Sequence, residues 1–334
     1  MHYIQKYLEN FSSASNTNKT TKTSNVLLYC NYYSFYSQKV LMALYEKNIE
    51  FEPVVIDITK GEQYSSWFIE INPRGEIPVL QHGKKSIPDS TRILDYLDTY
   101  LQPGLLFTPI INVSNDLKVT EKIEQFREKV DALPVGVITI GSFYHQHLCG
   151  KPKLPFVLPV REVLKSGDMT SSQNLRKYAE ENPKAKATLL YKAEIQERKH
   201  EIIRDEDEYV KILNIVDDVL DAVEEELENQ ALIEGMWLCS EQFSIADISV
   251  GVLLHRLWEI GLEDRFWANG KRPKIEAYLE RVKQRESFKR TIPNLPHHIK
   301  MIASSQPPVY VGAAVVSSLG FVLGVFYLLK KLVR

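Results

Sequence analysis

The sequence predicts an α+β fold with a mixed N-terminal domain, an all-α C-terminal domain and a C-terminal transmembrane helix. Strand and helix patterns alternate over residues 25–102, whereas only helical patterns remain over residues 103–290. An unbroken apolar run then extends from Val309 to Leu329. As a helix this run would reach about 31 Å, the thickness of a bilayer's hydrocarbon layer.

The N-terminal domain begins with a strand, a helix and a second strand. Val26 to Tyr29 is a short apolar run typical of a buried strand, and Ser34 to Asn48 then has helical spacing. Phe51 to Ile58 alternates as a second strand does, and Trp67 to Ile71 indicates a short helix. The opening of this domain is therefore predicted as βαβ followed by a helix.

A proline marks the start of the third predicted strand. In Gly75 to Leu80, Pro78 lies where a turn enters a strand, and proline is tolerated there only at an edge, a bulge or a cis bond. A hairpin across His82 to Lys85 follows, and Asp89-Ser90-Thr91 begins an amphipathic helix. The order of these elements is that of a thioredoxin-like domain.

The C-terminal domain is predicted from helical spacing and two breaks. Lys118 to Asp131 begins a helix that Pro134 kinks or breaks. The segment 151–207 is a strongly charged helical insertion, and it has a stop at Asn182-Pro183. Ser244 and Asp247 are spaced as a capping box before an apolar, buried helix, which assigns both residues to folding rather than to catalysis.

Both ends of the chain are expected to lie outside the two domains. Residues 1–24 are predicted to be a flexible leader, and 291–308, rich in proline, a linker to the membrane. The apolar run 309–329 lies so close to the C-terminus that it predicts a tail anchor, with the body facing the cytosol. By analogy with other tail anchors, its moderate hydropathy and short basic tail favour the mitochondrial outer membrane, with the peroxisome second and the endoplasmic reticulum third.

Composition excludes several other functions. The 41 basic and 43 acidic residues give a net charge of -2, so no overall positive field indicates a nucleic-acid partner. The 3 cysteines lie far apart, which fits a reducing compartment and argues against a zinc site. No glycine-rich phosphate loop is present, so we expect no nucleotide hydrolysis. No metal and no obligatory cofactor are predicted.

Four segments resemble the glutathione transferase superfamily: Tyr29 to Lys39, Gly75 to Leu80, Asp89 to Leu94, and Phe243 to Asp247. The charged insertion and the apolar tail depart from ordinary soluble transferases. Together with Ser34 to Val40 and Trp267 to Pro273, these departures resemble the ganglioside-induced differentiation-associated protein family. The resemblance implies a homodimer of the mitochondrial outer membrane that influences fission, network shape, redox balance and organelle contacts.

The resemblance also implies a glutathione site. In active transferases a hydroxyl or thiol at the start of the first helix stabilises the glutathione thiolate, and here Ser34 fits best among Cys30, Tyr33, Ser34 and Ser37. The backbone of Val79, in the strand that Pro78 opens, would pair with the cysteinyl part of glutathione. Asp89 and Ser90, at a helix N-terminus, would hold the γ-glutamyl carboxylate. Each of these residues also has an ordinary structural role.

Two functions of different classes follow. The first is a dimeric, tail-anchored adaptor that engages proteins governing mitochondrial shape through the insertion 151–207. The second is an active membrane-bound transferase that conjugates glutathione, its substrate, to electrophiles. Glutathione as a ligand alone is compatible with the first function. A third, weaker hypothesis is redox sensing through Cys30 or through an intermolecular disulfide across the dimer.

Overall fold

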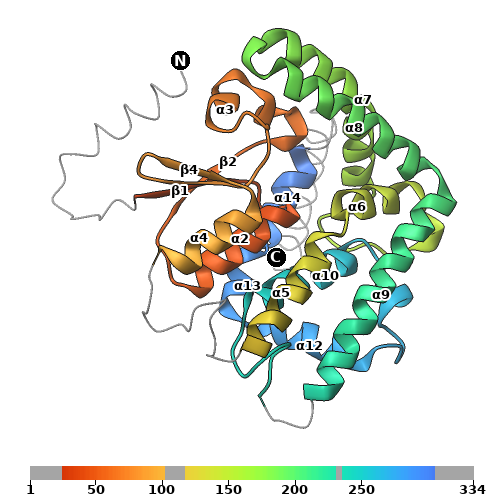
Figure 1. Ribbon diagram of the computed structural model, residues 1–334. Coiled ribbons are helices and arrows are strands. Elements are labelled where there is room, and N and C mark those ends of the chain that lie inside the picture. Colours follow the sequence, from red (N-terminus) through yellow and green to blue (C-terminus); the bar gives the residue numbers. More distant parts are fainter. Residues whose placement is uncertain (1–24, 102–116, 231–234, 305–334) are drawn as a thin grey trace, which may run out of the picture.

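The computed structural model describes residues 25–101, 117–230 and 235–304. A small sheet with its helices forms one part of the molecule, and a larger group of helices forms the other (Figure 1). The predicted α+β class is therefore confirmed. The predicted leader 1–24 and tail anchor 309–329 lie outside the described residues.

The four strands of the described residues form one mixed sheet in the order β2-β1-β3-β4. They are β1 (Val26–Cys30), β2 (Glu52–Val55), β3 (Val79–His82) and β4 (Lys85–Pro88). β1 pairs in parallel with β2 and antiparallel with β3, and β3 and β4 form an antiparallel hairpin. β2 is shorter than the predicted strand from Phe51 to Ile58, because Asp57 caps a 3-10 turn that begins at Ile58.

Helices cover both faces of this sheet, as Figure 1 shows. They are α2 (Phe35–Glu46), α3 (Ser66–Ile71) and α4 (Ser90–Thr99). Because side chains alternate along a strand, Leu28 and Cys30 enter the main core with α2 and α4. Tyr29, between them, packs with Phe68 of α3 on the opposite face. This is the thioredoxin-like arrangement that the sequence predicts.

The second domain is all-helical within the described residues. Its helices are α5 (Leu117–Asp131), α6 (Val135–Tyr144), α7 (Leu158–Glu181), α8 (Lys186–Arg204), α9 (Glu206–Gln230), α10 (Ile245–Glu259), α11 (Glu263–Phe266), α12 (Pro273–Gln284), α13 (Glu286–Thr291) and α14 (Leu295–Ser304). The break predicted at Pro134 separates α5 from α6, and Asn182-Pro183 separates α7 from α8.

Helix α10 forms the centre of this domain. Its residues from Ile245 to Leu257 are all buried, and the predicted capping box is present. The Ser244 hydroxyl donates a hydrogen bond of 2.7 Å to Asp247, which also accepts one of 2.8 Å from the Tyr278 hydroxyl. Both residues of the box are thus folding residues, as predicted, because their polar atoms are satisfied inside the core.

The charged insertion is a helical hairpin, α7 and α8, and one of its faces packs on the N-terminal domain. Figure 1 shows the end of the hairpin beside α3. Leu175, Leu189 and Ala193 form a buried cluster with Ile69 of α3. The Asn182 side chain donates to the Tyr64 carbonyl at 3.4 Å. The insertion is therefore also a structural bridge, which its charge pattern alone does not indicate.

The chain beyond α13 is not an irregular linker throughout, as the sequence predicts for 291–308, because residues 295–304 form α14. Among the described residues, no helix combines the length and the apolar character that crossing a bilayer requires. Since 309–329 lies outside those residues, the tail anchor remains a prediction from the sequence.

Candidate functional site

The strand register brings the predicted site residues to one edge of the sheet, the edge at which β1 and β4 end and β3 begins. Val79, the first residue of β3, lies opposite Tyr29 near the end of β1 and opposite Pro88 at the end of β4. Ser34 follows β1, Pro78 precedes β3, and Ser90 follows β4. Because these chain ends meet at the same edge, residues from three separated segments converge there.

Ser34 is the N-cap of α2. Its hydroxyl oxygen accepts a hydrogen bond of 3.3 Å from the Ser37 backbone N–H, and the side chain is half-buried. An oxygen that accepts from a helix N–H retains its own proton for donation. The positive end of the helix dipole strengthens that donor toward an anion. Capping and thiolate stabilisation are therefore compatible roles for the same hydroxyl.

The other three candidates from the sequence are placed less favourably. Ser37 is fully buried and accepts from the Asn31 N–H at 3.3 Å. The Tyr33 hydroxyl lies 3.4 Å from Nδ1 of His298, and burial followed by the charge of Glu259 raises its pKa to about 12. Of the four, Ser34 alone combines a helix N-terminus with partial exposure.

Cys30 is not suited to redox sensing. The thiol is fully buried in the main core, and desolvation raises its pKa to about 12. Because the thiolate is the reactive form, a buried thiol with this pKa is protonated at neutral pH and shielded from oxidants. Burial of the thiol therefore argues against redox sensing through Cys30.

The turn before Ser34 is fixed by the C-terminal domain. The Arg256 guanidinium of α10 donates to the Tyr33 carbonyl at 2.7 Å, and it also bonds Glu259 at 3.0 Å. Gln38 donates to the Tyr32 carbonyl at 2.9 Å from within α2. These buried donors satisfy the carbonyls of a half-buried turn from the inside, which holds the Ser34 backbone in position.

The peptide bond between Ile77 and Pro78 is cis, one of the alternatives that the sequence leaves for this proline. Val79 is fully buried and is flanked by Tyr29 on one side and Pro88 on the other. Its backbone therefore has no open side for a peptide ligand, contrary to the role predicted for it. Ile77 lies just outside the strand and is half-buried, so it offers the free backbone at this edge.

Asp89 and Ser90 form the start of α4. The Asp89 carboxylate accepts from the N–H groups of Thr91 at 3.0 Å and Arg92 at 3.2 Å, and its φ is 79°. A positive φ at a non-glycine residue is strained, and such strain is found at ligand sites. An open depression of about 480 Å³ lies here, lined by Asn72, Pro73, Arg74, Pro88, Asp89 and Arg92. Its two guanidinium groups suit a carboxylate-bearing ligand.

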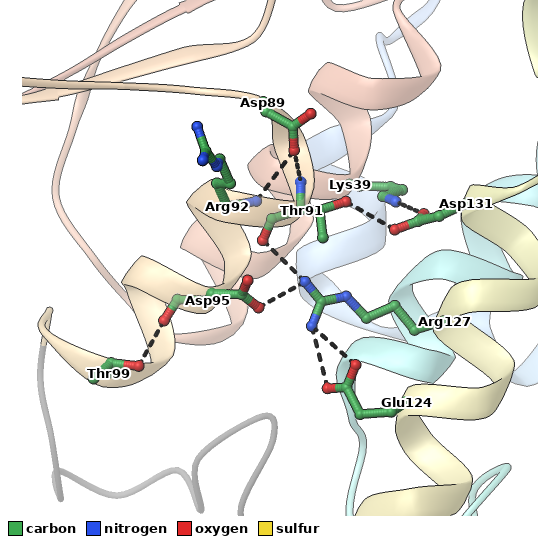
Figure 2. A network of polar contacts seen from close by, with 9 residues as sticks. All are labelled: Lys39, Asp89, Thr91, Arg92, Asp95, Thr99, Glu124, Arg127 and Asp131. Atoms are coloured by element: carbon green, nitrogen blue, oxygen red, sulfur yellow. Dashed lines mark hydrogen bonds and ion pairs between the residues drawn. The ribbon is translucent and has the colours of Figure 1, made fainter.

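A cross-domain polar network holds α4 against α2 and α5 (Figure 2). Asp131 of α5 pairs with the buried ammonium of Lys39 and accepts from the Thr91 hydroxyl at 2.8 Å. Arg127 donates to the Thr91 carbonyl at 2.9 Å and to Asp95 at 2.6 Å. Because Thr91 follows Ser90 directly, the network fixes the N-terminus of α4 relative to that of α2.

Helix α14 lies against the same turn as Ser34. Its His297 ring packs edge-on to Tyr32 at 6.1 Å between centroids, and His298 lies 5.8 Å from the Tyr33 ring. Desolvation lowers the pKa of His298, so the imidazole ring that contacts Tyr33 is neutral at physiological pH. The sequence does not predict this contact, because residues 291–308 are expected from it to form a linker.

Arg256, Ile77 and the network around Asp131 are likewise not predicted from the sequence. One signal was available: Lys39 and Arg256 are charged residues inside otherwise apolar helices, a pattern that indicates a buried partner. The identity of each partner requires the tertiary structure.

Comparisons with known proteins agree with this architecture. Family models of the glutathione S-transferase N-terminal domain and C-terminal domain match residues 28–101 and 193–281. Ganglioside-induced differentiation-associated protein 1-like 1 of Homo sapiens is 29% identical over 328 residues, which cover 92% of this chain and 87% of that protein. Protein LigF of Sphingobium sp. is 52% identical over 74 residues, 22% of this chain and 29% of LigF.

Solved structures show the same fold. The crystal structure of the beta-etherase LigF has a TM-score of 0.60 at 24% identity and covers 80% of this chain and 98% of its own. A glutathione S-transferase of Methylobacillus flagellatus with glutathione bound has a TM-score of 0.50 at 20% identity, over 80% of this chain and 100% of its own. The chain is therefore a glutathione S-transferase-like protein, and its predicted resemblance to the ganglioside-induced differentiation-associated proteins is confirmed over almost its whole length.

Proposed function

We propose that this chain is a tail-anchored, homodimeric glutathione transferase-like protein of the mitochondrial outer membrane. Its body faces the cytosol, binds glutathione, and acts as an adaptor that regulates mitochondrial fission and redox balance. The similarity to a ganglioside-induced differentiation-associated protein over 92% of the chain supports the assignment. The apolar run from Val309 to Leu329 supports the anchor.

One observation supports the ligand above all others: the register of β1, β3 and β4 gathers Ser34, Ile77 and Ser90 at a single sheet edge. Glutathione has a carboxylate at each end and a thiol between them. The N-terminus of α4 receives the γ-glutamyl carboxylate, the backbone of Ile77 pairs with the cysteinyl peptide groups, and Ser34 donates to the sulfur.

The adaptor role is assigned to the outward face of the α7–α8 hairpin. Its inner face packs on α3, whereas Met169 is 49% exposed and Tyr191 is 59% exposed. Both apolar side chains are accessible to a partner protein, and we assign them to the adaptor surface. The face is thus available to partners while the hairpin stays docked.

Two cell experiments test this proposal. Removal of residues 309–334 releases the protein to the cytosol, whereas membrane retention would refute the anchor. The double substitution of Met169 and Tyr191 by Lys abolishes the effect of the full-length protein on mitochondrial shape. Leu117→Lys, at a residue that is 77% exposed on α5, is the matched control and retains that effect. Unchanged morphology in the double variant contradicts the adaptor surface.

The second candidate is an active membrane-bound transferase. The observation that favours it is the Ser34 hydroxyl at the positive end of α2, with its oxygen bonded to Ser37 and its proton available. In that case Ser34→Ala lowers turnover of glutathione with an electrophile about 100-fold while leaving glutathione affinity nearly unchanged. Equal turnover by the variant removes Ser34 from catalysis.

A further inference from the structure

The insertion brings a cation to the edge of the proposed glutathione site. Lys192 of α8 forms an ion pair with Glu76, the residue directly before Ile77. The Lys192 side chain is 19% exposed and that of Glu76 is 48% exposed. Lys192 is therefore largely covered by protein, whereas its partner carboxylate faces solvent.

The packing of α8 determines where Lys192 points. Leu189 and Ala193 are fully buried against Ile69 of α3, and Lys192 lies three residues after the first and one before the second. Residues three apart, such as Leu189 and Lys192, are neighbours on a helix surface, so Lys192 lies beside the face that docks on α3. From there its ammonium reaches Glu76 in the turn from Gly75 to Pro78.

Glu76 does not neutralise this corner. Its carboxylate also lies 3.6 Å from the Arg74 guanidinium, so two cations share one acidic group and the local charge is positive. The backbone of the turn is fixed independently, because the Asn72 side chain donates to the Glu76 carbonyl at 2.8 Å. The Glu76 side chain can therefore leave Lys192 without unfolding the turn.

The direction of the ligand follows from the sheet edge. A peptide that pairs antiparallel with Ile77 and places its γ-glutamyl end at Ser90 extends its other end past Ile77 toward Glu76. That other end is the glycyl carboxylate. It reaches the corner where Lys192 holds a carboxylate in the unliganded protein.

We infer that Lys192 of the insertion is a ligand-binding residue, which exchanges the Glu76 carboxylate for the glycyl carboxylate of glutathione. The inference rests on the proposed glutathione site. It makes the insertion part of that site, so ligand binding and the docking of the hairpin are coupled. By reciprocity, glutathione alters the affinity of the hairpin for its protein partners to the same degree that those partners alter glutathione affinity.

The test is calorimetric titration of the full-length, detergent-solubilised protein with glutathione and with its ethyl ester, in which the glycyl carboxylate is masked. The wild-type protein binds glutathione about tenfold more tightly than the ester, the factor expected for one charge-assisted hydrogen bond. Lys192→Gln removes this preference and leaves ester affinity unchanged. Lys186→Gln, an equal charge change at an exposed residue of α8, keeps the preference.

A second variant is expected to raise glutathione affinity rather than lower it. Glu76→Gln removes the competing carboxylate, so glutathione binds about threefold more tightly, a result that misfolding does not produce. If Lys192→Gln still binds glutathione more tightly than the ester, the inference is overturned but the proposed glutathione site stands. The same holds if the wild-type protein binds glutathione and the ester equally well. Absence of binding to the wild-type protein overturns the inference together with the proposed glutathione site.

Discussion

Lys39 of α2, which is fully buried, forms an ion pair between the two domains with the half-buried Asp131 of α5, and the same carboxylate accepts from Thr91 beside Ser90 (Figure 2). The ammonium is fully buried, and desolvation lowers its pKa whereas the charge of Asp131 raises it. The pair therefore links the start of the first helix, the start of α4 and the C-terminal domain in one contact.

Removing the acidic partner leaves a buried cation without its counter-charge. Asp131→Asn is therefore expected to lower the free energy of unfolding by about 3 kcal/mol, measured by urea denaturation. Glu197→Gln breaks the exposed pair with Arg176, in which both side chains are 47% exposed, and costs no more than about 1 kcal/mol. Equal losses of unfolding free energy in the two variants would contradict the claim that burial of Lys39 makes its ion pair the more important one.

Two glycines of α6 provide a matched pair. A Cβ at Gly141 would lie 2.2 Å from the Tyr209 ring, whereas nothing lies within 4 Å of one at Gly136. Gly141→Ala is therefore expected to destabilise the protein by about 2 kcal/mol, because Tyr209 is fully buried and must shift. Gly136→Ala stabilises it by up to about 1 kcal/mol through helix propensity. Thermal unfolding of both variants measures the contrast.

The strained start of α4 predicts a difference between two substitutions of Asp89. Asp89→Ala loses the cap to Thr91 and Arg92 and retains a φ of 79° that alanine disfavours, so we expect a loss of about 2 kcal/mol. Asp89→Gly also loses the cap, but glycine tolerates this φ, so the loss is about 1 kcal/mol or less. A glycine variant less stable than the alanine variant contradicts the strain.

Cys30 provides the pH-dependent prediction. Its pKa is about 12 in the folded protein against an unfolded value of 9.0, so the folded state retains the proton longer than the unfolded state. This contribution to stability is complete below pH 9 and is lost as the pH rises toward 12. In the native protein at pH 8, mass spectrometry detects no alkylation of Cys30 by iodoacetamide, whereas denatured protein is labelled.

Local signals in the sequence were sufficient for most of the fold. The alternation in β1, the helical spacing after Ser34 and the Ser244–Asp247 capping box each depend on neighbouring residues, so each could be identified without the structure. The helix over 295–304 could not be identified, because Pro296 and the other prolines of 291–308 suggest a linker. The contacts of its histidine rings with Tyr32 and Tyr33 join residues far apart in the sequence.

The candidate site, like the fold, could be predicted from the sequence only in part. Ser34 and Ser90 follow from family resemblance, but their convergence depends on the strand register. Arg256 donates a hydrogen bond to the Tyr33 carbonyl, 223 residues away in the sequence, and Lys192 forms an ion pair with Glu76, 116 residues away. No local pattern encodes such pairs. The predicted role of Val79 was wrong for a related reason, since the sequence does not reveal that β1 and β4 flank it on both sides.

The central claim is that the sheet edge at Ser34, Ile77 and Ser90 binds glutathione. Calorimetric titration of glutathione into the full-length, detergent-solubilised protein tests it most directly, with Ser90→Ala as the control variant. We predict binding with a Kd in the micromolar to millimolar range, weakened about tenfold in Ser90→Ala. Absence of binding by a protein with a cooperative thermal transition would contradict the claim and leave the transferase fold as a scaffold for the insertion.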